Sequence, residues 1–178
     1  QSDANVKKIS GYITKKVADR LEEIFKKERQ SFEEKWDNVK IFIEYGMISD
    51  EKFCERALKF CLLKNTDGKY FSIEDYRKAI KAEQTDKDKT LVILYATDPQ
   101  AQYSYIDAAK NKGYDVLLLD CHLDSYFVNM LETKLENVKF ARVDSDSVDR
   151  LIVKEDRKKP ELSEDEKKAL DEIFKAGL

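Results

Sequence analysis

Apolar residues in the first third of the chain recur every three or four positions, a spacing that places them on one face of a helix. Charged residues fill most of the positions between them. The first run consists of Val6, Ile9, Ile13, Val17, Leu21, Ile24 and Phe25. Gly11 weakens this run without ending it. The pattern therefore predicts a long amphipathic helix at the start of the chain.

Three shorter helices are predicted to follow. The first begins at Ser31, because Ser31 and Glu34 have the spacing of a capping box, and is expected to end at Gly46. Its apolar stripe is Phe32, Trp36, Val39 and Ile43. The second begins near residues 49–50 and carries Phe53, Ala57, Leu58, Cys61 and Leu62. After a turn signal at 65–68, Ser72 is the expected N-cap of the third, with Ile73, Tyr76 and Ile80.

The pattern changes after the polar stretch 83–89. Continuous apolar runs at 90–96, 115–120 and 138–143 are typical of strands covered on both faces. Between them, one helix is predicted from Asp98-Pro99 to Gly113 and another over 124–133. Two consecutive strand–helix–strand units imply a small parallel sheet with right-handed crossovers. The predicted fold class is α/β, with a helical segment followed by a small three-layer α/β/α subdomain.

The last residues indicate a third segment. Residues 154–160 are charged and turn-like, typical of a linker, and a capping box at Ser163 opens another helix. We therefore expect a helical segment at 1–84, an α/β/α subdomain at 85–153, and a linker with a helix at 154–178. The chain starts at Gln1 rather than Met and stops within that last helix, so we expect an excised piece of a longer protein.

Composition narrows the class of partner and compartment. Acidic and basic residues are interspersed and the net charge is −3, which disfavours nucleic acid as a partner. The three cysteines are odd in number and widely spaced, which indicates a reducing, cytoplasmic setting. Since no apolar run approaches the ~18 residues of a membrane span, we expect no membrane contact.

Candidate chemistry is sparse, and we expect no catalytic, cofactor-binding or metal site. The turns after the first two strands, Tyr95 to Pro99 and Leu119 to Leu123, lack the glycines that a phosphate site needs. Cys121 and His122 are adjacent, but such neighbours point apart, so we interpret them as a half-buried thiol beside a surface imidazole. Cys54 and Cys61 are interpreted as core thiols. The acids at 144, 146 and 149 lack the glycine and the closing glutamate of a calcium loop.

Three stretches resemble the heat-shock protein 90 chaperone family, of the bacterial high-temperature protein G type. Residues 1–17 (QSDANVKKISGYITKKV) resemble the helix after that family's catalytic loop, and 71–76 (FSIEDY) resemble the segment that enters its small subdomain. Residues 113–119 (GYDVLLL) with 123–131 (LDSYFVNML) resemble a strand and helix within that subdomain. Their order and spacing match from Gln1 to about Val153, which identifies the chain with the C-terminal half of the family's middle domain.

The resemblance implies a module that couples an N-terminal ATPase domain to a C-terminal dimerisation domain. It places ATP, Mg and the catalytic-loop arginine outside this chain, with Gln1 matching a loop glutamine, so the chain alone would be neither an enzyme nor a dimer. Unfolded or partly folded client proteins are the implied partners. Ser125, Tyr126 and Asn129 match the family's client-binding helix, although Ser125 replaces an acid and Tyr126 a tryptophan.

Two other functions stay open at this point. A flavodoxin-like enzyme would require a phosphate or flavin site at the carboxyl end of a strand. A helical adaptor would instead bind one folded partner with fixed stoichiometry. Tyr126 has a second interpretation as well, in which it packs on the neighbouring subdomain rather than contacting a client.

Overall fold

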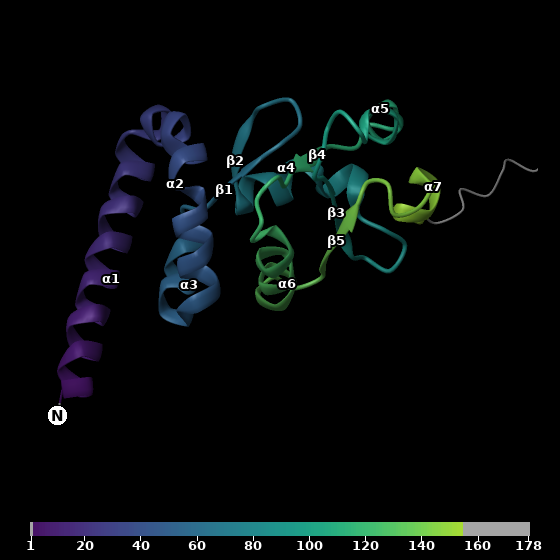
Figure 1. Cartoon of the computed structure of the whole chain (residues 1–178). Coiled ribbons are helices and arrows are strands. Elements are labelled where there is room, and N and C mark those ends of the chain that lie inside the picture. The colour runs from purple at the N-terminus through teal and green to yellow at the C-terminus, as the bar shows by residue number, and fades with distance from the viewer. Residues whose placement is uncertain (1, 155–178) are drawn as a thin grey trace, which may run out of the picture.

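The computed structural model describes residues 2–154 and begins with three helices, α1 (Ser2–Lys27), α2 (Arg29–Ser49) and α3 (Glu51–Ala57) (Figure 1). The helices α1 and α2 are joined at Glu28 and pack through Phe25 and Phe32, whose rings meet edge to face at 5.8 Å. The predicted amphipathic helices are therefore confirmed. Gln1, the linker at 155–160 and the helix after Ser163 lie outside the described residues.

The predicted ends of α2 are wrong at both sides. The helix starts at Arg29, so Ser31 lies inside its first turn and makes no capping box. Gly46 does not end it, because the helix continues to Ser49. Glycine is needed there for a close approach: a Cβ on Gly46 would lie 2.7 Å from a ring carbon of Phe53 in α3. Asp50 then caps α3, its side chain accepting a hydrogen bond from the Phe53 amide at 2.9 Å.

The predicted extension of α3 through Leu62 is also wrong. The helix ends at Ala57, and an antiparallel hairpin follows, formed by β1 (Leu62–Lys64) and β2 (Tyr70–Ser72). The turn expected at 65–68 is the loop of this hairpin, where the Asn65 side chain accepts bonds from the amides of Asp67 and Lys69. Helix α4 (Ile73–Gln84) starts at the expected cap, with Ser72 accepting from the Asp75 amide at 3.1 Å.

The predicted parallel sheet is confirmed. It consists of β3 (Leu91–Ala96), β4 (Val116–Leu118) and β5 (Val138–Arg142) in the order β4-β3-β5. Helix α6 (Asp124–Lys134) is close to its predicted bounds, and α7 (Val148–Leu151) is short. Helix α5 (Tyr103–Asn111) begins later than predicted, because Asp98 accepts bonds from the amides of Gln100 and Ala101 in a turn before it.

Helices cover both faces of this sheet, as the three-layer prediction requires. Leu91 and Ile93 of β3 point into a core shared with α2, α3, α4 and α6. Val92, Leu94 and Ala96 point the other way, into a smaller core with Ile106 and Ala109 of α5. The larger core runs without a break from the helical segment to the sheet, so the described helices and strands share one packed interior on that side.

Both edges of the sheet carry hydrogen bonds from outside it. At the β4 edge, the amide of Thr66 in the hairpin donates to the Val116 carbonyl at 2.9 Å. At the β5 edge, the Phe140 amide donates to the Glu132 carboxylate of α6 at 2.6 Å.

Buried Gln84 joins α4 to β3 and to the residue before β4. Its side chain donates to the Val92 carbonyl at 2.9 Å and accepts from the Asp115 amide at 2.6 Å. Within 2–154, every helix is too short or too polar to cross a bilayer.

Candidate functional site

Helix α6 presents the three residues singled out by the sequence on its outer face. Phe127, Val128 and Leu131 point inward and are buried. Ser125, Tyr126 and Asn129 are exposed, and their one- and four-residue spacing places them on one face. Tyr126 is 64% exposed, which does not fit the interpretation that it packs on the neighbouring subdomain of the described chain.

The inner face of this helix packs in the core, and polar contacts lie at both of its ends. At its start, the Asp124 carboxylate accepts a hydrogen bond from the Cys121 amide at 2.5 Å. Near its end, Lys134 pairs with Glu51 of α3 at 2.8 Å. A helix packed in this way presents Tyr126 as an exposed aromatic surface with a polar tip, the kind of side chain that contributes most to protein contacts.

Other apolar side chains are exposed on the helical segment, and the sequence pattern did not single them out as a surface. On α1 they form one stripe at helical spacing, and on α2 they lie opposite its buried face. They are Val6, Ile9, Ile13 and Val17 on α1 and Ile41, Phe42 and Tyr45 on α2. The sequence does contain a signal for this surface, because α1 has more apolar positions than its contact with α3 covers. Periodicity alone, however, does not separate a face that packs in the core from a face that docks a partner.

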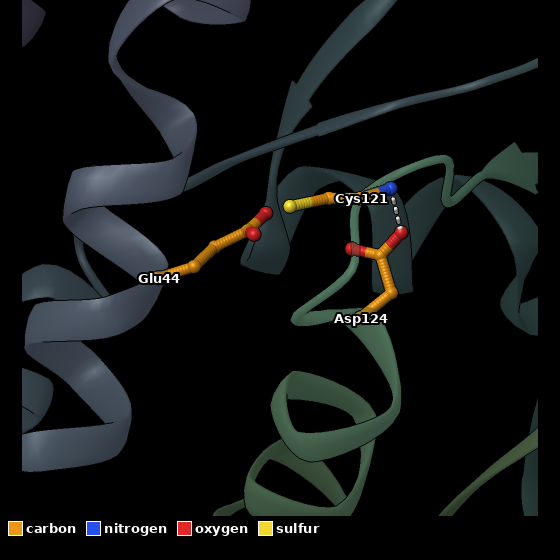
Figure 2. A group of neighbouring side chains, drawn as sticks. All are labelled: Glu44, Cys121 and Asp124. Carbon is orange, nitrogen blue, oxygen red and sulfur yellow. Dashed lines mark hydrogen bonds between the residues drawn. The ribbon is translucent and has the colours of Figure 1, made fainter.

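A second candidate group of residues lies between α2 and the start of α6. Figure 2 shows the side chains of Glu44, Cys121 and Asp124 converging, and the possible ligand atoms of the three lie within 4.8 Å of one another. Burial raises the pKa of Glu44 to about 7, with the negative charge of Asp124 acting in the same direction. Sequence reasoning missed Glu44, because a single acid beside an apolar stripe carries no spacing signature.

The adjacent pair Cys121 and His122 has the environment expected from the sequence. The thiol is half-buried and the imidazole is exposed. Burial raises the pKa of Cys121, which keeps the thiol protonated rather than activating it as a nucleophile. Cys54 and Cys61 are both buried, as expected of core thiols.

The turn after β3 uses its own side chains to bind its backbone amides. The Gln102 side-chain oxygen accepts from the amides of Thr97 and Asp98 at 2.8 and 3.0 Å. Asp98 accepts from the next free amides, those of Gln100 and Ala101. A phosphate at this strand end would have to displace these bonds, so the geometry argues against the flavodoxin-like alternative.

Known proteins resemble this chain over its whole length. The family model described as "Hsp90 protein" matches residues 1–178. The chain is 57% identical to the chaperone protein HtpG of Bacteroides fragilis and 56% identical to that of Porphyromonas gingivalis, in both cases over 100% of the chain and 26% of the relative. It thus spans about a quarter of the length of these relatives. The middle domain of a heat shock protein from Plasmodium falciparum has the same fold, with a TM-score of 0.61 at 17% identity, over 78% of this chain and 57% of that one.

Proposed function

Since the chain belongs to the Hsp90 protein family, we propose that it is a middle-domain module that contacts unfolded client proteins and couples neighbouring domains. The observation that carries the client role is the exposed face of α6, where Tyr126 stands out from a helix whose inner face is buried in the core. Tyr126 can cover an apolar segment of a client with its ring, while Ser125 and Asn129 bind the client's backbone groups.

The coupling role is supported by the core that α2, α3, α4 and α6 share with the sheet. Movement of the helical segment would be transmitted to the sheet as a shift of packed elements, because close-packed interiors do not deform smoothly. The exposed stripe of α1 gives this segment a surface for a neighbouring domain. The segments 1–84, 85–153 and 154–178 are our proposed division of the chain.

The remaining activities belong, in this proposal, to the longer protein. ATP and Mg would bind in a separate N-terminal domain, and a C-terminal domain would make the homodimer. Gln1 would assist the nucleotide site, while the chain alone would neither hydrolyse ATP nor dimerise. The whole protein would act in the cytoplasm. A helical adaptor with one folded partner is the alternative function, and it would use the exposed face of α2 instead.

The client role can be tested by NMR titration of the isotope-labelled chain with a permanently unfolded protein. We expect amide shifts around Tyr126 and Asn129, and weaker binding by Tyr126→Ala. Tyr103→Ala is the matched control, because Tyr103 is 69% exposed on α5, the helix on the opposite face of the sheet. Equal weakening by the two variants, or shifts confined to α2, would refute the assignment of the client surface to α6.

A further inference from the structure

The cluster between α2 and α6 brings two carboxylates and a thiol together below the surface. Glu44 of α2 is only 5% exposed, and its Oε2 atom has no hydrogen-bond partner among residues 2–154. An unpaired buried carboxylate costs several kcal/mol unless it is neutralised by a proton or a cation. Lys40, one turn before Glu44, offsets this charge only in part: its positive charge opposes the rise in the pKa of Glu44 that burial causes, but its ammonium group pairs with Asp120.

The two other groups come from the loop that leads into α6. The Cys121 thiol points toward the Glu44 carboxylate in Figure 2, and the Asp124 carboxylate lies beside them. One oxygen of Asp124 accepts the bond from the Cys121 amide, which holds this carboxylate in place. Its second oxygen remains available to a ligand. Two carboxylate oxygens and one sulfur atom thus converge from two different elements of the fold.

We propose that Glu44, Cys121 and Asp124 form a binding site for a divalent transition-metal cation, with Zn²⁺ as the best fit. Zinc accepts sulfur and carboxylate ligands together, whereas magnesium and calcium require oxygen ligands in larger number. Three protein ligands leave a fourth, tetrahedral position for water. A tetrahedral zinc ion with bonds of about 2.3 Å to sulfur and 2.0–2.2 Å to oxygen holds its ligand atoms about 3.4–3.6 Å apart. Because the ligand atoms of the cluster lie within 4.8 Å of one another, metal binding would draw them together by up to about 1.3 Å.

A bound cation would connect α2 to the start of the helix that carries Tyr126. The site joins the helical segment to the sheet subdomain at the point where Lys40 and Asp120 already pair. Binding of a ligand to the folded chain alone raises its stability by mass action. The proposal does not depend on the client role, since the site faces the α2–α6 contact and not the exposed face of α6.

The test is a titration of the metal-free chain with Co²⁺, a spectroscopic substitute for Zn²⁺. We expect a thiolate-to-cobalt charge-transfer band in the near ultraviolet, visible bands of tetrahedral intensity, and loss of both when Zn²⁺ is added. Cys121→Ser should abolish the charge-transfer band. Glu44→Gln, which preserves shape, should weaken Co²⁺ binding at least about tenfold, since even lost second-shell partners have that effect.

Controls separate this site from the other thiols and from misfolding. Cys54→Ala removes a buried thiol outside the cluster and should leave the bands unchanged. Circular dichroism of each variant shows whether its fold is intact. Added Zn²⁺ should raise the Tm of the wild type but not that of the cluster variants, because only the wild type binds the ion. The proposal is overturned if the wild type gives no thiolate band up to millimolar Co²⁺, or if Cys121→Ser retains it. In the first case a proton, and not a metal, neutralises Glu44; in the second, the metal binds at another thiol.

Discussion

Replacing Gly46 by alanine separates helix propensity from packing at the α2–α3 contact. Alanine in a helix interior is more stable than glycine by about 0.5–1 kcal/mol. At Gly46 the added Cβ would lie 2.7 and 2.9 Å from two ring carbons of Phe53. That ring is buried and packs edge to face on Phe60 at 6.2 Å, so it has little room to move away. Overpacking of this kind costs about 1–3 kcal/mol.

Gly11 is the matched control, since it also lies inside a helix but a Cβ there would meet nothing within 4 Å. We expect Gly11→Ala to raise the free energy of unfolding by about 0.5–1 kcal/mol and Gly46→Ala to lower it by about 0–2.5 kcal/mol. Because both variants gain the same propensity, the difference between them measures the clash alone. Urea unfolding monitored by circular dichroism gives both values, and Tm should change by about 2–4 °C per kcal/mol.

A third variant decides whether the Phe53 ring is the cause. In a Phe53→Leu background the ring carbons are gone, and Gly46→Ala should become stabilising, as it is at Gly11. The coupling energy from this double-mutant cycle should then match the difference between the two glycine variants. If Gly46→Ala alone is as stable as Gly11→Ala, the close approach does not restrict residue 46, and our reason for the glycine inside α2 is wrong.

Two further predictions concern polar contacts. Tyr76→Phe should lower the free energy of unfolding by about 1–2 kcal/mol, because buried Tyr76 donates to the Asp115 carboxylate at 3.0 Å. As a control, Tyr103→Phe at an exposed position should change the free energy of unfolding by less than about 0.5 kcal/mol. For Glu22, hydrogen bonds from Lys26 and then Arg56 lower its pKa from 4.5 to about 2, so its stabilising effect is present above pH 4.5 and is lost as pH falls toward 2. Glu22→Gln should remove this part of the acid dependence, less than about 1 kcal/mol for such a surface pair; identical acid profiles would contradict it.

Periodicity was sufficient to predict the helices and the parallel sheet, because each has a long enough apolar pattern. It failed for the hairpin at 62–72, where strands of three residues each are too short to show alternation and Leu62 continues the helical spacing of α3. It also failed at Gly46, where the glycine serves a contact with Phe53 that sequence spacing does not reveal. Local signals predict ends and turns only where no tertiary contact overrides them.

The two candidate sites also differ in how far the sequence alone predicts them. Ser125, Tyr126 and Asn129 could be named from the sequence, since they lie within one turn of one helix and the family resemblance points to them. The cluster around Glu44 could not, because its members come from α2 and from the loop before α6 and meet only in the folded chain. The exposed fraction of Tyr126 likewise depends on tertiary packing.

The hydrogen bonds at the two edges of the parallel sheet bear on how the proposed client would be held. An extended polypeptide could otherwise extend the sheet as a further strand, the usual risk of an unpaired edge and a common mode of peptide recognition. The Thr66 amide occupies the Val116 carbonyl at one edge, and Glu132 occupies the Phe140 amide at the other. The chain is thereby hindered from taking up an extended segment as a further strand at these two positions. Its contact with a client would be made through side chains, which release a bound segment more readily than a ladder of backbone bonds.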